Sequence, residues 1–210
     1  MDGTLASLHR PGGGLTGVVW WTLASPIVLL PPRRRRVLLL GLAGGSVAWA
    51  VRALEPGAEI VGVENDAEVL RVARRHLDLD QLNVELAIGD ALEFLRRDRR
   101  RFDLIVEDLF VGSSRSVRKP EGLIEEGYPL LERRRHRGGL VVSNTIHEMP
   151  DIVRAMRPLG GRIVSLDVRG HWNRIVVCGP LPAPAQMRRV LGGYPALAAI
   201  LPRLAIRSRG

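Results

Sequence analysis

The sequence of 210 residues predicts an α/β fold: a seven-stranded, mostly parallel sheet with one antiparallel edge strand and helices on both faces. Continuous apolar segments, typical of buried strands, alternate with segments whose apolar residues follow helical spacing. Near the C-terminus, two apolar segments are separated only by a short polar link, as in a hairpin. The composition agrees, because 46% hydrophobic and 25% charged residues are ordinary for a globular domain.

Seven segments have the apolar character of buried strands. They are residues 37–40, 59–63, 84–88, 102–106, 138–143, 162–168 and 174–178. Helices are predicted for residues 48–54, 67–77, 91–96, 124–133, 151–157 and 185–191. Strands that alternate with helices favour a parallel sheet, whereas the hairpin formed by the last two segments requires one antiparallel edge strand.

The chain is predicted to contain an N-terminal segment and one larger domain. Residues 1–36 form a short segment whose helix, residues 20–30, is expected to cover part of the core or of the site. Residues 37–210 form a single domain without an internal repeat or linker. The longest apolar run, residues 17–30, contains Pro26 and is too short for a transmembrane helix. Its flanks do not fit a signal peptide.

Cysteine and charge usage argue against two classes of function. Cys178 is the only cysteine, which excludes a disulfide framework and a multi-cysteine metal site and fits a reducing cytoplasm, so we expect no metal. The net charge is +9, and arginines gather in residues 33–36, 96–101 and 133–137. We interpret these runs as solvated helix ends or loops. With 4% aromatic residues available for base stacking, a nucleic-acid partner is disfavoured.

A glycine-rich turn follows the first strand. Gly41, Leu42, Ala43 and Gly45 lead into a helix, and such a turn lets a ligand approach the backbone and the free N–H groups of the helix start. Glu64 ends the second strand nineteen residues after Gly45, a spacing at which nucleotide-binding folds place an acid on the ribose hydroxyls. The turn alone is also compatible with simple packing. The turn and the acid together indicate a nucleoside site.

Later strand ends add further candidates. Asp90 and Ala91 follow the third strand, where Asp90 accepts from an adenine amino group, caps the next helix, or does both. Asn65 follows the second strand and is a further cofactor-binding candidate. Asp108 follows the fourth strand and is the candidate general base or amine-orienting group, because ligands bind outside the carboxyl ends of the strands. It is also a cofactor-binding candidate.

Six side chains are candidates for the acceptor site because of their place along the chain. They are Trp20, Glu107, Phe110, Arg118, Asn144 and His147. Residues 109–119 form either a lid or a polar connection. Asn144 and His147 follow the fifth strand, and for His147 a place in a loop or helix start outweighs a role as base.

Together, the Gly41–Ser46 turn, Glu64, the Gly89-Asp90-Ala91 triplet and residues 102–108 resemble the spermidine synthase branch of the class I S-adenosylmethionine-dependent methyltransferase superfamily. The resemblance covers roughly residues 15–180 and implies a Rossmann-like domain that binds S-adenosylmethionine or its decarboxylated form. It implies that the turn lies at the ribose and amino-acid tail of the cofactor, Glu64 at the ribose and Asp90 at the adenine.

The sequence departs from this branch in two respects. Aminopropyl transferases of this branch have an Asp-x-x-Asp pair after the fourth strand. Asp108 matches the first aspartate, but Val111 stands at the second position and can neither accept a proton nor hold an ammonium group. The branch's N-terminal domain, which helps to bind the polyamine, is nearly absent. The resemblance therefore supports the nucleoside half of the site more strongly than the polyamine half.

The sequence predicts a cytoplasmic transferase that moves a methyl group from S-adenosylmethionine to a small-molecule acceptor. Three alternatives stay open. One is a polyamine aminopropyltransferase, with spermidine synthase activity in polyamine biosynthesis. The others are a nucleic-acid or protein methyltransferase and a non-catalytic cofactor-binding homologue. No membrane partner is expected, and residues 20–30 with the proline-rich tail are candidates for a homodimer surface.

Overall fold

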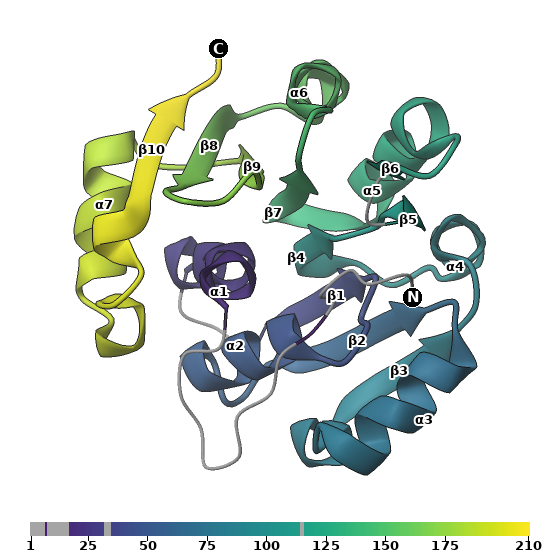
Figure 1. Ribbon diagram of the computed structural model, residues 1–210. Coiled ribbons are helices and arrows are strands. Elements are labelled where there is room, and N and C mark those ends of the chain that lie inside the picture. Colours follow the sequence, from purple (N-terminus) through teal and green to yellow (C-terminus); the bar gives the residue numbers. More distant parts are fainter. Residues whose placement is uncertain (1–6, 8–16, 32–34, 114–115) are drawn as a thin grey trace.

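One central sheet organises the chain. The computed structural model describes Ser7 and residues 17–31, 35–113 and 116–210, so much of the predicted N-terminal segment lies outside the described residues. The sheet has eight strands in the order β10-β8-β9-β7-β4-β1-β2-β3 (Figure 1). They are β1 (Arg36–Leu40), β2 (Glu59–Glu64), β3 (Val84–Ile88), β4 (Phe102–Glu107), β7 (Arg135–Thr145), β8 (Arg162–Val168), β9 (Arg174–Gly179) and β10 (Leu204–Ser208).

Helices and short helical turns connect these strands. The α-helices are α1 (Val18–Ala24), α2 (Ser46–Leu54), α3 (Ala67–His76), α4 (Ala91–Arg97), α5 (Tyr128–Arg134), α6 (Met149–Met156) and α7 (Pro184–Gly192). The short turns are η1 (Ser25–Leu29), η2 (Leu79–Leu82), η3 (Leu123–Gly127), η4 (Arg157–Leu159), η5 (Pro195–Leu197) and η6 (Leu201–Arg203). No helix in the described part of the chain is long and apolar enough to cross a membrane.

The predicted fold class is confirmed, and strand direction differs from the prediction only near the C-terminus. β3, β2, β1, β4 and β7 are parallel. β9 is antiparallel but lies inside the sheet between β7 and β8, and the edge is an eighth strand, β10, antiparallel to β8. The many prolines of the tail concealed β10 in the sequence. The crossover through α6 leaves room for one strand beside β7, and the returning hairpin strand β9 fills it.

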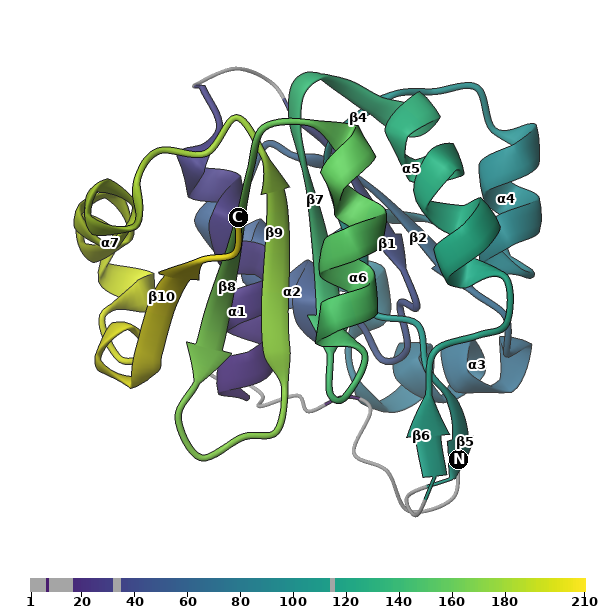
Figure 2. The same cartoon turned by 90° about the horizontal axis from the view of Figure 1, so that it is seen from above.

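Helices cover both faces of the sheet. Helices α1, α2, α3 and α7 pack on one face, and α4, α5 and α6 pack on the other (Figure 2). Strand β1 supplies both cores because successive side chains of a strand point to opposite faces. Val37 and Leu39 belong to the first core, and Leu38 and Leu40 belong to the second. The central strands are therefore continuously apolar, which is the pattern that the sequence displayed.

A small hairpin follows β4 and projects beyond the sheet (Figure 2). It consists of β5 (Val111–Ser113) and β6 (Ser116–Arg118), in the segment expected to be a lid or a polar connection. Gly112 has a φ of +106°, and a Cβ atom at this position would lie 1.9 Å from the carbonyl oxygen of Ser116. Only glycine fits here, so this residue allows the two short strands to pair.

Two arginines of the predicted solvated runs are buried, which corrects that interpretation for them. Arg35 is 6% exposed and donates from its guanidinium to the carbonyl oxygens of Ile27, Leu30 and Pro31, at 2.7, 2.8 and 2.8 Å. Arg134 is 7% exposed, and its Nε donates to the carbonyl oxygen of Leu95 near the end of α4. Both side chains donate to backbone carbonyl groups in or near the last turn of a helix. Arg33 and Arg34 lie outside the described residues.

The two neighbouring arginines at the start of β1 provide a matched pair of substitutions. We expect Arg35→Met to lower the free energy of unfolding by about 3 kcal/mol, because it leaves several buried carbonyl groups and Glu55 without their donor. Arg36→Met removes an exposed ion pair with Glu59 and should cost less than about 1 kcal/mol. Urea denaturation of both variants checks this. Equal costs would contradict the structural role assigned to Arg35.

Candidate functional site

The carboxyl ends of the parallel strands meet at one edge of the sheet, where a cleft opens. The strand order reverses between β1 and β4, since β1 continues to β2 on one side and β4 continues to β7 on the other. Ligands of open α/β sheets bind at such a reversal. The cleft has a volume of about 600 Å³, within the range of roughly 300–1,000 Å³ typical of cofactor and small-molecule sites.

The glycine-rich turn after β1 forms one wall of the cleft. Gly41 has a φ of +82°, and a Cβ atom there would lie 2.6 Å from the carbonyl oxygen of Asp108. Glycine at this position therefore lets the end of β1 lie close against the end of β4. Gly41 and Ala43 line the cleft, and Ala43 has a left-handed φ of 47°. The predicted cofactor residues Leu42 and Gly45 do not line it, because Leu42 is buried in the core and Gly45 caps α2.

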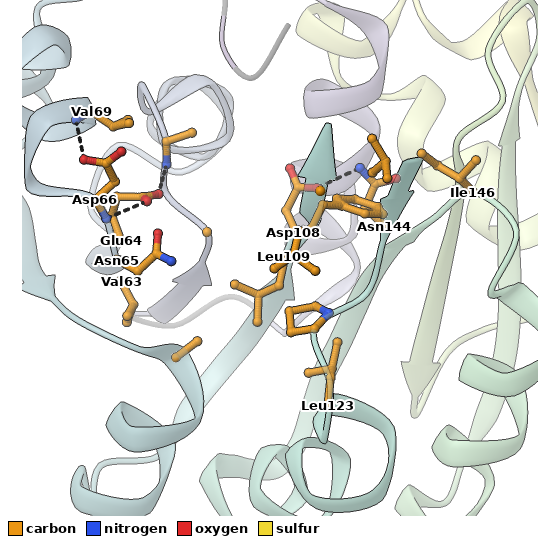
Figure 3. Close-up of a pocket in the computed structure, with 18 of the residues that line it drawn as sticks. Val63, Glu64, Asn65, Asp66, Val69, Asp108, Leu109, Leu123, Asn144 and Ile146 are labelled. Carbon is orange, nitrogen blue, oxygen red and sulfur yellow. Dashed lines mark hydrogen bonds between the residues drawn. The ribbon is translucent and has the colours of Figure 1, made fainter. Parts of the chain in front are cut away.

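Two backbone N–H groups orient the carboxylate of Glu64 in the cleft. It is 9% exposed at the end of β2 and lines the cleft. Its Oε2 accepts a hydrogen bond from the backbone N–H of Ala43 at 2.8 Å, and its Oε1 accepts from the N–H of Asp66 at 3.1 Å (Figure 3). Each carboxylate oxygen has a second lone pair. The side chain is thus fixed by the backbone and still able to accept two hydroxyl groups.

The remaining residues of this side come from the ends of β2 and β3. Asn65, Asp90 and Ala91 line the cleft as expected from the sequence. Asp90 caps α4 by accepting from the N–H of Glu93 at 2.9 Å through Oδ1, and Oδ2 has no hydrogen bond within the described residues. Asp66 also lines the cleft and caps α3, a residue that the sequence analysis missed. Its place directly after Asn65, before an amphipathic helix, was the available signal.

Asp108 belongs to a chain of three polar side chains on the opposite side of the cleft. The amide nitrogen of Asn144 donates to Asp108 Oδ1 at 2.7 Å, and the amide nitrogen of Asn173 donates to Asn144 Oδ1 at 3.0 Å (Figure 3 shows the first contact). All three line the cleft. Asn173 thereby fixes which end of the Asn144 amide faces Asp108. Asn173 was not among the predicted site residues, because nothing local in the sequence indicates that the link before β9 reaches the cleft.

The environment of Asp108 changes its acidity. Burial raises the pKa of Asp108 from its ordinary 3.8 to about 6, and the hydrogen bond from Asn144 and the charge of Lys119 limit this rise. The nearby charge of Glu107 adds to it. A carboxyl group with a raised pKa that lines a cleft is suited to accept a proton from a ligand near neutral pH.

Glu107 was expected at the acceptor site, but the structure buries it and it does not line the cleft. Its carboxylate is fully buried and accepts hydrogen bonds from Lys119 Nζ at 2.6 Å and from the N–H of Leu109 at 2.8 Å. The hydroxyl group of Ser143 donates to the other oxygen, and the hydroxyl group of Tyr128 lies 3.5 Å from it. With these donors around it, Glu107 has a structural role and does not face a ligand.

The other acceptor candidates divide into two groups. Trp20, Phe110 and Asn144 line the cleft, whereas Arg118 and His147 are exposed and lie outside its lining. His171 of the β8–β9 loop lines the cleft and was missed, since nothing local in the sequence indicated that this loop reaches the site. Within the described residues, no group of three or more His, Cys, Asp or Glu side chains could hold a metal ion.

The raised pKa of Asp108 makes a prediction about stability. The folded protein holds this proton up to about pH 6, whereas the unfolded chain loses it near pH 4, so ionisation of Asp108 costs folding free energy as the pH rises. We expect Asp108→Asn to gain stability relative to the unchanged protein by about 2 kcal/mol between pH 4 and pH 7. Denaturation of both proteins across this range measures the difference. A difference that stays constant or shrinks would contradict the assignment.

Comparisons with known proteins bear on the fold. No protein-family model and no curated protein matches the sequence. Among solved structures, human methyltransferase-like protein 13 in complex with SAH matches with a TM-score of 0.69 at 20% identity, covering 93% of this chain and 95% of that one. A probable spermidine synthase from Corynebacterium glutamicum matches with a TM-score of 0.69 at 17% identity, covering 99% and 77%.

A third structure is a spermidine synthase in complex with the transition state analogue AdoDATO. It matches with a TM-score of 0.64 at 19% identity, covering 81% of this chain and 63% of that one. Each of the three likenesses covers at least 81% of this chain. The chain therefore has the Rossmann-like fold that methyltransferases and spermidine synthases share.

Proposed function

We propose that the cleft binds S-adenosylmethionine and that the chain transfers its methyl group to a small-molecule acceptor. The observation that supports this most directly is the carboxylate of Glu64, which two backbone N–H groups hold beside the glycine-rich turn. Both of its oxygens keep the capacity to accept from the two vicinal hydroxyl groups of a ribose. The ribose of one nucleoside ligand could therefore bind to both oxygens of Glu64.

The two sides of the cleft suit the two partners of a transfer reaction. On the side of β2 and β3, Glu64 would bind the ribose, and Asp90 Oδ2 would accept from the adenine amino group. The turn at Gly41 and Ala43 would hold the amino-acid tail. Across the cleft, Asp108 would face the reactive carbon (Figure 3). The solved structures of the same fold that contain SAH or AdoDATO support a ligand of this class.

The sulfonium group of this cofactor makes its methyl carbon electrophilic, so the protein has to position donor and acceptor in line. The acceptor atom forms a bond to the methyl carbon while the carbon–sulfur bond breaks, and the electron pair stays on sulfur. The acceptor's proton passes to Asp108, whose pKa is raised to about 6 by burial. Asn144 and Asn173 would act as positioning residues for this carboxylate.

Aminopropyl transfer from the decarboxylated cofactor is the second candidate. The likeness to a probable spermidine synthase favours it, because that match covers 99% of this chain. Val111 disfavours it, because this residue lines the cleft at the position where the resembling enzymes have their second aspartate. We therefore rank methyl transfer first.

A macromolecular acceptor receives less support, because the described arginines are largely engaged within the protein. Arg96 contacts Glu93 and Glu126, and Arg100 contacts Glu85 and Asp98. In these ion pairs the carboxylates neutralise guanidinium charge that could otherwise bind the phosphate groups of a nucleic acid. Cofactor affinity without transfer would instead indicate a non-catalytic homologue.

Calorimetric titration with S-adenosylmethionine, its decarboxylated form and methylthioadenosine tests the proposal. We expect preference for S-adenosylmethionine and an at least roughly tenfold loss of affinity in Glu64→Ala, since each hydrogen bond to a charged group contributes about 1.5–3 kcal/mol. Glu68→Ala is the matched control, because Glu68 lies on α3 in an exposed pair with Arg71 and does not line the cleft.

Each result of this titration leads to a different conclusion. Preference for the decarboxylated cofactor would favour aminopropyl transfer despite Val111. Equal losses of affinity in Glu64→Ala and Glu68→Ala would show that Glu64 does not bind the ribose. Binding of none of the three compounds to a folded protein would overturn the proposal.

A further inference from the structure

We infer that the acceptor side of the cleft takes an uncharged, flat molecule with one weakly acidic hydroxyl group, that is, a phenol. This inference rests on the proposed function and names its acceptor. The acceptor side is defined here as Asp108 together with Val19, Trp20, Phe110, Val117, Ile146 and His171, all of which line the cleft. They come from α1, the segment after β4, the hairpin, and the loops that follow β7 and β8.

The charged side chains of the cleft favour a neutral acceptor. Of the described acids that line the cleft, Glu64, Asp66 and Asp90 lie on the cofactor side, which leaves Asp108 alone on the acceptor side. Glu107 is nearby, but Lys119 neutralises it at 2.6 Å. A diamine brings two ammonium groups, and an ammonium group buried without a partner is strongly disfavoured. One carboxylate therefore suits a neutral acceptor and not a polyamine.

The walls of the acceptor side are largely aromatic, which favours a flat acceptor. Three aromatic rings, those of Trp20, Phe110 and His171, line this side from three separate elements. The Phe110 ring is held in place by Lys119 Nζ, which lies 4.0 Å from the ring centroid. Rings of this kind pack favourably against another flat aromatic ring, by stacking or edge-to-face contact. Val117 and Ile146 add aliphatic surface.

The hydroxyl group of the acceptor follows from Asp108. Asn144 occupies Oδ1, and within the described residues Oδ2 has no hydrogen bond, so it is available to an O–H donor. A phenol has a pKa of about 10, whereas an aliphatic alcohol is a far weaker acid. The raised pKa of Asp108 lies closer to the pKa of a phenol than the pKa of an ordinary carboxyl group does.

The reaction balances with these groups alone. The phenol proton moves to Asp108 Oδ2, and the phenol oxygen forms a bond to the methyl carbon. The carbon–sulfur bond breaks, and its electron pair stays on sulfur. The products are an aryl methyl ether and S-adenosylhomocysteine, and the protonated Asp108 returns its proton to water.

The test uses 2-naphthol as the probe, with naphthalene and putrescine for comparison. Calorimetry measures binding of each compound to the full chain, with and without S-adenosylhomocysteine, and mass spectrometry follows methyl ether formation with S-adenosylmethionine. We expect 2-naphthol to bind in both states, at least about tenfold more tightly than putrescine, and to be methylated. Asp108→Asn should keep 2-naphthol binding and lower the transfer rate at least about 100-fold.

A second pair of variants tests the charge argument. Val111→Asp adds a carboxylate to the cleft and should strengthen putrescine binding and weaken 2-naphthol binding. Val72→Asp is the control, since Val72 is 42% exposed on α3 and does not line the cleft. If 2-naphthol fails to bind, or putrescine binds the unchanged protein as tightly, the inference is wrong. Because 2-naphthol is also titrated without S-adenosylhomocysteine, binding of the probe and binding of the cofactor are measured separately. Failure of S-adenosylhomocysteine to bind would count against the proposed function and not against the acceptor.

Discussion

The buried carboxylate of Glu107 is the constraint on which the acceptor side of the cleft depends. It joins β4 to Lys119 at the end of the hairpin, and its other oxygen contacts Ser143 of β7 and Tyr128 of α5. A buried carboxylate without donors would cost several kcal/mol, so the elements that bring these donors must pack together. Lys119 also donates to the carbonyl oxygen of Leu109 and lies over Phe110. One charge pair thus fixes Leu109 and Phe110, which line the cleft.

Two adjacent acids at one strand end have different roles because a strand alternates its side chains. Glu107 points into the core, where Lys119 compensates its charge, and Asp108 points into the cleft with neutral amides beside it. The first carboxylate is structural and the second is left with a raised pKa. On the cofactor side, backbone N–H groups orient Glu64 without neutralising it. Among the described acids, the cleft therefore presents Asp108 alone to the proposed acceptor, and Glu64, Asp66 and Asp90 line the side of the proposed cofactor.

Local patterns predicted much of the fold and of the cofactor side. The apolar strands, the turn at Gly41 and the acid at Glu64 lie close together along the chain, so spacing alone was informative. The acceptor side depends on strand order and on long-range contacts. His171 and Asn173 reach the cleft only because β9 lies beside β7, and Glu107 is buried only because Lys119 folds back onto it. Arg35 was likewise assigned to a solvated run, because the sequence does not show that its guanidinium donates to the carbonyl oxygen of Ile27.

A crystal structure of the chain with S-adenosylhomocysteine would show directly whether the cleft is a nucleoside site. We expect the ribose hydroxyl groups to contact both oxygens of Glu64, the adenine to lie beside Asp90 and Ala91, and the sulfur atom to face Asp108. A ligand bound away from the carboxyl edge of the sheet, or in the cleft without contact to Glu64, would contradict this expectation.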